Sequence, residues 1–382
     1  MRFSDIIGQD RVKDLLRRSL DEGHVSHAQL LAGRNGYGSL ALALAYAQYI
    51  MCSDRHDGDS CGICPSCLKI SNLEHPDLHF SFPVAKSEFA TQSGGELTSD
   101  ALMAKWRQMV SQTSDPSCYF DEKDWYSHIG IGKNSQGIIN RSEAHDIIRK
   151  FGYKSYEGGY KILIMWLPER MNDSAANKLL KLFEEPDGRT LFLFVSENPD
   201  SVLGTILSRT QRIDVPPVDV SSLGDYISVR FNTPDAQGMA RVARGDVMRA
   251  MYLASESGAE DDNFEMFASL MRLCFAVDHV KLMEWGDNMA AMGREVQKGF
   301  VDYSLRMLRD SYMVTVGVPS LSHAFGKEAQ FISRFFPFVN HTNIETLISE
   351  FERVSLELNF NANAKILFTH FALSISKLIR KA

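Results

Sequence analysis

The order of apolar and polar positions divides the chain into a mixed first part and a helical second part. Three short apolar runs have the length and flanks of buried parallel strands: residues 28–32, 161–167 and 190–196. Helical periodicity lies between and before these runs, over residues 10–22, 39–52 and 173–185, and the last of these helices is expected to end before Pro186. The first part is therefore predicted to be an α/β module built on a parallel sheet.

From residue 216 onward strand signals nearly disappear, and apolar residues recur at helical spacing, as at Leu347, Phe351, Val354 and Leu358. Residues 80–138 fit neither pattern. They contain loop-like stretches at 93–95 and 134–137 and one amphipathic segment at 100–110. We interpret this region as an insertion into the α/β module.

Composition narrows the class of protein. A chain of 382 residues with 44% hydrophobic and 23% charged residues is typical of a globular protein of two or three domains. Its apolar runs fall far short of the ~20 residues that a membrane span requires, and Asp5 and Asp10 interrupt any signal peptide. We expect a cytoplasmic protein without membrane contact. The net charge of -7 argues against nucleic-acid binding by bulk charge, although a local basic surface remains open.

A glycine-rich turn, Gly33-Arg34-Asn35-Gly36-Tyr37-Gly38, joins the first apolar run to the helix after it. A phosphate-binding P-loop has glycines at the spacing of Gly33 and Gly38, followed by a lysine for the phosphates and a hydroxyl for Mg²⁺. Here Ser39 and Leu40 follow instead. Two interpretations stay open: a glycine turn without a phosphate role, and a degenerate P-loop in which Gly33, Gly36 and Gly38 bind nucleotide weakly or not at all.

The second element of a nucleotide site is altered as well. A Walker B strand ends in acidic residues that hold Mg²⁺, whereas the run at 161–165 continues into Trp166-Leu167-Pro168, and Glu169 comes later. With both elements degenerate, the chain is not expected to hydrolyse ATP.

Four of the six cysteines, Cys52, Cys61, Cys64 and Cys67, fall within sixteen residues. Paired C-x₂-C turns present sulfurs to one metal, and in a chain without an export signal metal binding is favoured over disulfides. Four thiolates leave no open coordination position, so the spacing predicts a structural Zn²⁺. We expect the nearby His56 to be a solvated loop residue, and Cys118 and Cys274 to be packing residues.

Other candidate residues have competing interpretations. Glu184 and Glu185 are interpreted as a helix terminus rather than an acid/base pair, and Trp125 and Tyr126 as local core rather than a base-stacking or partner surface. Two roles are equally compatible with the sequence around four basic residues: contacts to phosphates, or a solvated helix face. These residues are Arg141, Arg149, Lys150 and Lys154.

Several segments resemble one family when read in order. They are Phe3–Gln9, Ser26–Ala28, the glycine turn, the four cysteines, His75–Asp77, Asn172–Pro186 and Ser208–Thr210. Together they resemble the AAA+ subunits of the bacterial DNA polymerase III clamp loader, over roughly residues 1–80 and 139–250. With both nucleotide elements degenerate, the chain is most similar to the delta-prime branch of that family. Residues 361–365, Asn-Ala-Asn-Ala-Lys, are similar to the collar region of these proteins.

The resemblance implies an AAA+ (P-loop NTPase-like) α/β module at 1–213, containing a zinc segment at 52–67 and the insertion at about 80–138. A helical lid at 214–258 and an all-helical collar at 259–382 follow. It also implies a non-hydrolysing stator that assembles with other AAA+ subunits to load the sliding clamp on primer-template DNA.

The same resemblance assigns roles to two arginines. The family's Ser-Arg-Cys motif reads Ser208-Arg209-Thr210 here, which makes Arg209 the candidate arginine finger acting in trans, and Arg249 stands at the family's sensor 2 position. Two alternatives remain, an active clamp-loader ATPase with a non-standard P-loop and a zinc-dependent DNA-binding module.

Overall fold

The computed structural model describes residues 1–85, 97–112, 118–131, 136–233, 235–255, 258–322, 324, 326–360 and 362–379. The loop predicted at 93–95, residues 134 and 135 of the one predicted at 134–137, and Asn361 lie outside these residues. The chain forms two compact units. The first comprises Met1–Tyr226 and Arg244–Arg249, and the second Ile227–Ala243 and Ala250–Ala382.

The first unit is built on a five-stranded parallel sheet with the order β2-β3-β4-β1-β5. Its strands are β1 (Ala28–Ala32), β2 (Leu78–Ser81), β3 (Lys161–Trp166), β4 (Thr190–Ser196) and β5 (Gln211–Asp214). The three predicted strands are confirmed, and β3 ends one residue earlier than expected. The sequence prediction missed β2 and β5, which are four residues long and lie at the two edges of the sheet.

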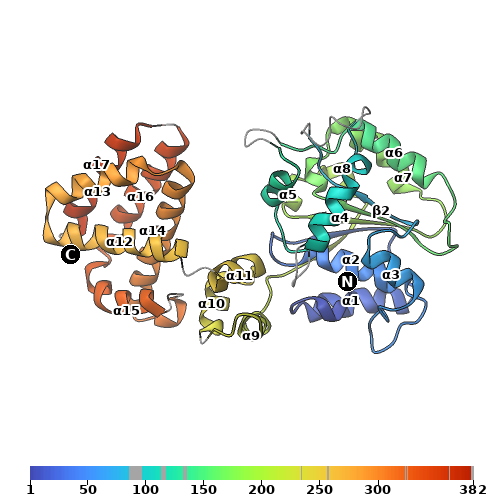
Figure 1. The fold of residues 1–382 in the computed structure, drawn as a ribbon, viewed down its shortest axis with the longest axis horizontal. Coiled ribbons are helices and arrows are strands. Elements are labelled where there is room, and N and C mark those ends of the chain that lie inside the picture. The colour runs from blue at the N-terminus through green and yellow to red at the C-terminus, as the bar shows by residue number, and fades with distance from the viewer. Residues whose placement is uncertain are drawn as a thin grey trace. The chain divides into compact units, whose positions relative to one another are not determined.

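Helices cover both faces of this sheet (Figure 1). One face packs against α6 (Arg141–Phe151), α7 (Asp173–Glu184) and α8 (Gly204–Leu207). The other packs against α2 (Ser39–Met51), which is covered in turn by α1 (Asp10–Asp21) and α3 (Pro65–Ser71). Because α2 lies between two layers, all its residues from Ser39 to Ile50 are buried, and it carries alanine and leucine on every side.

The region interpreted as an insertion is more regular than expected. It contains η3 (Ser99–Leu102), α4 (Met103–Gln112) and α5 (Glu122–His128). The predicted amphipathic helix is confirmed, although its first turn is a 3₁₀ helix. Trp106 and Trp125 are completely buried, so this region has its own aromatic core.

No strand occurs after β5 in the described part of the chain, as the helical periodicity predicts. The helices there are α9 (Val220–Phe231), α10 (Ala236–Ala243), α11 (Val247–Ser255), α12 (Gly258–Ala276), α13 (His279–Ala291), α14 (Arg294–Thr315), α15 (Gly326–Phe335), α16 (Ile344–Asn359) and α17 (Ala364–Leu378). Short 3₁₀ turns complete the chain: η1 (Phe3–Asp5), η4 (Pro168–Arg170), η5 (Pro199–Ser201), η6 (Pro319–Leu321) and η7 (Phe336–Phe338).

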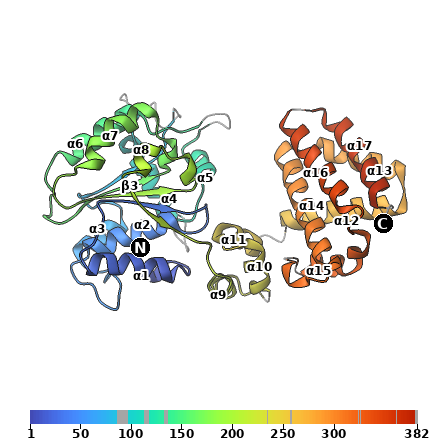
Figure 2. The same ribbon diagram turned by 180° about the vertical axis from the view of Figure 1, so that it is seen from behind.

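The second unit has one hydrophobic core, to which α12 to α17 contribute (Figure 2). Phe300, Phe351 and Phe371 at its centre are completely buried. None of the described helices combines the length and apolar character that crossing a bilayer requires. The division into module, lid and collar at 213/214 and 258/259 stays a prediction.

Candidate functional site in the glycine loop and the cysteine cluster

The glycine turn connects β1 to α2 at the carboxyl end of an interior strand, where α/β proteins bind ligands. Gly36 and Gly38 have φ values of +79° and +90°, which lie in the left-handed region that favours glycine. The predicted order of strand, glycine turn and helix is therefore confirmed.

Other parts of the first unit approach these glycines closely. A Cβ on Gly36 would lie 2.0 Å from Oδ1 of Asp246, and one on Gly38 would lie 2.7 Å from the hydroxyl oxygen of Tyr119. The backbone N–H of Val247 donates to the carbonyl of Gly36 at 3.0 Å. Because Gly36 and Gly38 lack side chains, Asp246 and Tyr119 can approach the turn closely. In a P-loop the corresponding turn would hold phosphate.

The space left beside the turn is a cavity of about 20 Å³. Tyr119, Phe120, Trp166 and Glu197 line it together with the turn and the start of α2. A single water needs at least about 10–15 Å³ of such space. The space beside the turn therefore has room for about one water.

Trp166, the last residue of β3, stands where a Walker B strand would place its acid, and only 2% of it is exposed. Its ring centroid lies 5.4 Å from that of Trp106 on α4 and 5.4 Å from that of Phe120. Trp106 also stacks on Phe82 at 4.4 Å. Tyr119 and Phe120 of the insertion and Trp166 of β3 thus form the aromatic wall of the cavity.

The predicted interpretation of Trp125 as local core is confirmed. The side chain is fully buried, packs edge-to-face on Trp106, and donates from Nε1 to the carbonyl of Pro83 at 2.9 Å. The hydroxyl of Tyr126 donates to Oε1 of Glu122 at 2.5 Å, and Glu122 also forms an ion pair with Arg170. Tyr126 therefore belongs to a polar network of the first unit.

Two carboxyl groups lie close to the ends of β3 and β4. Oε1 of Glu169 accepts the backbone N–H groups of Glu197 and Asn198, each at 3.0 Å. Burial raises the pKa of Glu169, while burial and the neighbouring Glu169 raise the pKa of Glu197 to about 8. Glu197 is thus mostly protonated at neutral pH, and a protonated carboxyl is a poor ligand for Mg²⁺. The sequence analysis did not single out Glu197. An acidic residue directly after a buried strand is the signal that could have indicated it.

Arg209 lies just after α8 on the surface of the first unit, and its side chain is 29% exposed. Its Nε donates to Oε1 of Glu184 at 2.6 Å, and its Nη2 also contacts that oxygen. Nη1 donates to the carbonyl of Thr205 at 2.6 Å and to Oγ of Ser208 at 3.1 Å. Arg209 is not among the described residues that line the cavity beside the glycine turn. Its hydrogen bonds to Glu184 and Thr205 hold the guanidinium in place.

Glu184 is the last residue of α7, and Glu185 is its C-cap. Their interpretation as a helix terminus is confirmed. The structure adds that Glu184 is the acidic partner of Arg209, a pairing that sequence patterns did not indicate.

Arg249 is near the start of α11, and its backbone N–H donates to Oδ1 of Asp246 at 3.0 Å. The turn before it is fixed to the rest of the first unit by a hydrogen bond of 3.1 Å from the N–H of Val218 to the carbonyl of Gly245. Through Asp246 the structure brings this turn to the glycine turn. The role assigned to Arg249 by resemblance stays a prediction.

The four clustered cysteines converge, and their sulfur atoms all lie within 4.8 Å of one another. The Sγ of Cys52 is 3.6 Å from that of Cys61 and 4.0 Å from that of Cys64, and the Sγ atoms of Cys61 and Cys67 are 4.0 Å apart. Tetrahedral coordination with Zn–S bonds of about 2.3 Å places sulfurs about 3.8 Å apart. The donor set and its spacing fit one tetrahedral metal ion.

Backbone N–H groups favour a thiolate at Cys64, whereas burial raises the pKa of the Cys52 and Cys67 thiols. The N–H of Cys61 donates to Sγ of Cys52, and the N–H of Cys64 donates to Sγ of Cys61, each at 3.3 Å. Burial raises the pKa of Cys64, but hydrogen bonds from the backbone N–H groups of Cys67 and Ser53 outweigh it and bring that pKa to about 6. Such donors stabilise negative charge on sulfur, which metal binding requires.

The loop between Cys52 and Cys61 is tied to the N-terminus of the chain. The carboxylate of Asp59 accepts the backbone N–H groups of Phe3 at 3.0 Å and Ser4 at 2.8 Å. His56 is exposed, as expected of a solvated loop residue, and its backbone forms an isolated antiparallel β-bridge with that of Asp59. The other two cysteines, Cys118 and Cys274, are buried, which confirms their interpretation as packing residues.

The basic residues considered for phosphate contacts are in part already paired. Arg149 forms an ion pair of 2.7 Å with Asp146, and Lys150 forms one of 2.5 Å with Asp100. Arg141 and Lys154 are exposed. These pairings reduce the local positive charge and favour the interpretation as a solvated face.

Comparisons with known proteins extend these observations. The family described as "DNA polymerase III, delta subunit" matches residues 8–219. The "DNA polymerase III subunit delta'" of Bacillus subtilis is 26% identical over 246 residues, which are 64% of this chain and 59% of that protein. The delta' subunit of Yersinia pestis is 30% identical over 195 residues, which are 50% of this chain and 42% of that protein.

A solved structure of a DNA polymerase III gamma subunit-related protein from Thermotoga maritima matches with a TM-score of 0.40 and 14% identity, over 96% of this chain and 99% of that one. The chain spans less than two thirds of the length of the curated relatives it matches. The family match covers more than half of the chain, so the resemblance to bacterial clamp-loader subunits is confirmed, and the chain belongs to the DNA polymerase III delta-subunit family, with delta-prime subunits among its relatives.

Proposed function

We propose that this chain is a non-hydrolysing AAA+ subunit of the replicative clamp loader. It assembles with ATPase subunits in the bacterial cytoplasm, and the complex loads the sliding clamp on primer-template DNA. The chain contributes a rigid scaffold and Arg209 rather than an ATP site of its own. Family membership supports the assembly, and the geometry of the glycine turn supports the lack of hydrolysis.

The observation that carries the proposal is the small size, about 20 Å³, of the cavity beside the glycine turn. Tyr119 contacts Gly38, and Trp166 replaces an acid at the end of β3. The lysine position holds Ser39, which is too short to reach a phosphate and carries no charge. An ATPase concentrates positive charge around the transferred phosphoryl group. Here Tyr119, Phe120 and Trp166 line the cavity, and Arg34 is the one cation among its described lining residues.

The position of Arg209 supports a role in trans. Its guanidinium is outside the cavity of its own chain, partly exposed, and held in place by Glu184 and the carbonyl of Thr205. An arginine finger needs such a presentation, because it stabilises charge on a γ-phosphate held by another subunit. In the assembled loader the phosphate would compete with Glu184 for the guanidinium.

For the cysteine cluster we propose a structural Zn²⁺ held by Cys52, Cys61, Cys64 and Cys67. The spacing of the four sulfurs and the N–H donors to two of them support this ligand set. Four protein ligands leave no site for a reacting water, so the ion would tie the loop between α2 and α3 together.

The first test is nucleotide binding by the isolated chain. A fluorescent ATP analogue titrated with Mg²⁺ should show no saturable binding, and ATP turnover should not exceed that of a buffer blank. Turnover above the blank that copurifies with the chain would favour the alternative, an active ATPase with a non-standard P-loop.

The second test uses the loader reconstituted with its ATPase subunits, clamp and primer-template DNA. Arg209→Ala should slow single-turnover hydrolysis at the site that receives the arginine by about 10³-fold. Arg212→Ala is the matched control, because Arg212 is also an exposed arginine paired with an acid, Asp214, at 2.7 Å. Equal rates in the two variant loaders would remove Arg209 from the mechanism.

A further inference from the structure

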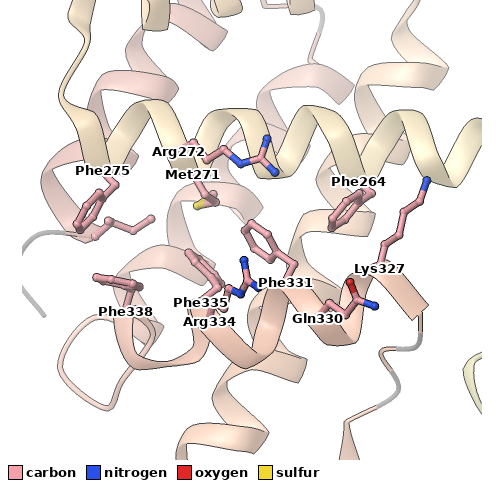
Figure 3. A pocket seen from close by; sticks show the side chains of 11 residues that line it. Phe264, Met271, Arg272, Phe275, Lys327, Gln330, Phe331, Arg334, Phe335 and Phe338 are labelled. Atoms are coloured by element: carbon pink, nitrogen blue, oxygen red, sulfur yellow. The ribbon is translucent and has the colours of Figure 1, made fainter.

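A cavity of about 450 Å³ opens on the second unit between α12 and α15 (Figure 3). Its size is in the range of ligand and peptide sites, about 300–1,000 Å³. It lies outside residues 8–219, the segment that defines the family. Neither the family match nor the proposed function assigns a role to it.

The floor of this groove is aromatic and continuous with the core of the unit. Phe264 and Phe331 pack edge-to-face with ring centroids 5.7 Å apart, and Phe331 lies 5.1 Å from Phe335. At one end Phe275 contacts Phe338 at 5.1 Å, and 59% of Phe275 is exposed. In Figure 3 these rings lie between the two helices, where α12 and α15 leave room for another side chain.

The polar lining is cationic. Arg272 on α12 and Lys327 and Arg334 on α15 line the groove, and none of its described lining residues is acidic. Within the described part of the chain no acidic side chain forms an ion pair with Arg272 or Arg334. On a chain of net charge -7, an apolar floor with a cationic rim is a local exception. It complements an apolar ligand that carries negative charge.

We propose that this groove docks an acidic amphipathic helix of a partner protein. Large apolar side chains at one face of that helix would fill the space over Phe331 and Phe335, and carboxylates beside them would meet Arg272 and Arg334. α15 has ten residues, or about 15 Å, so the groove accommodates about three turns of a partner helix. Single-stranded nucleic acid fits less well, because stacking needs open ring faces, and Phe264 and Phe335 are each only 7% exposed.

The test measures anisotropy of a fluorescein-labelled peptide of about twelve residues, with Leu and Phe at positions i, i+4 and i+7 and Glu elsewhere. The full chain should bind it saturably, and the same peptide with Gln in place of Glu should bind at least tenfold more weakly. R272E/R334E should weaken binding at least tenfold. The control K281E/K365E reverses two exposed cations of the same unit outside the groove and should stay within twofold.

Phe275→Ala separates the apolar floor from the charged rim. Because Phe275 is largely exposed, the variant should keep its thermal midpoint within about 2 °C and still bind at least threefold more weakly.

Four results would overturn the proposal. The first is no saturable binding up to about 1 mM peptide, and the second is equal loss in both double variants. The third is displacement of the peptide by an oligo-dT strand that itself binds more tightly, which would assign the groove to nucleic acid. The fourth is concentration-dependent dimerisation that R272E/R334E abolishes, since a second copy would then be the occupant.

Discussion

Ser39→Lys restores the residue that a P-loop has at this position, and we expect it to disrupt the first unit rather than to create an ATP site. Ser39 is 6% exposed at the start of α2, beside the cavity of about 20 Å³. Lysine has three more side-chain heavy atoms than serine. If each needs as much of such space as a water, about 10–15 Å³, the three atoms need about twice the available space.

The expected cost follows from overpacking and charge burial. Overfilled cores lose about 1–3 kcal/mol, and taking the ammonium out of water adds to this loss. We therefore expect the free energy of unfolding to fall by about 2–4 kcal/mol. The control Ser174→Lys places the same residue in the first turn of α7 at an exposed position, and should cost no more than about 1 kcal/mol through the helix dipole.

Urea unfolding followed by tryptophan fluorescence measures this loss in the relevant unit. Trp106, Trp125 and Trp166 lie in the first unit, and only Trp285 lies in the second. The midpoint of Ser39→Lys should fall by about 1 M or more, with the slope unchanged. A variant that keeps the midpoint of the parent chain and binds an ATP analogue in the micromolar range would refute the reasoning, because a closed cavity could not then be what prevents binding.

Three further predictions concern the metal cluster, a buried carboxyl and the Arg209 pair. The purified chain should contain about one zinc per molecule. The Cys64→Ser variant should release its zinc to a colorimetric chelator at least tenfold faster than the parent chain, because three sulfurs leave the ion open to water. Equal release rates would argue against Cys64 as a ligand. Glu197 keeps its proton in the folded chain up to about pH 8 but loses it near pH 4.5 in the unfolded chain, so its contribution to stability is lost as pH rises between these values. The stability of Glu197→Gln relative to the parent chain should therefore increase from pH 5 to pH 8 in thermal unfolding. A stability difference that stays constant over this range would contradict the raised pKa. Glu184→Gln should lower the free energy of unfolding by less than about 1 kcal/mol, because both partners of the ion pair are partly exposed; a larger loss in urea unfolding would show that the pair serves the fold.

The sequence predicted those elements whose pattern lies within a short stretch of the chain. β4 spans the predicted residues because all its positions are buried and its five central residues are apolar, and the cysteine cluster was predictable because its four members lie within sixteen residues. β5 was missed because three of its four residues are exposed, so it carries no apolar run.

The contacts that define the glycine turn could not be predicted in this way. Tyr119 and Asp246 reach Gly38 and Gly36 from positions about 80 and 210 residues later in the chain. Likewise Glu184 and Arg209 meet only because α7 and the segment after α8 pack together, 25 residues apart. A sequence pattern shows the missing lysine, whereas the closing of the cavity is a property of the fold.

The aromatic wall of Tyr119 and Trp166 also has a thermodynamic consequence. A ligand shifts a conformational equilibrium only by the difference in its affinity for the two states. If this chain holds no nucleotide, as we propose, ATP and ADP have no such difference in affinity and cannot shift its conformation directly. Under that proposal, movements that ATP drives in partner subunits would reach this chain only through its interfaces with them.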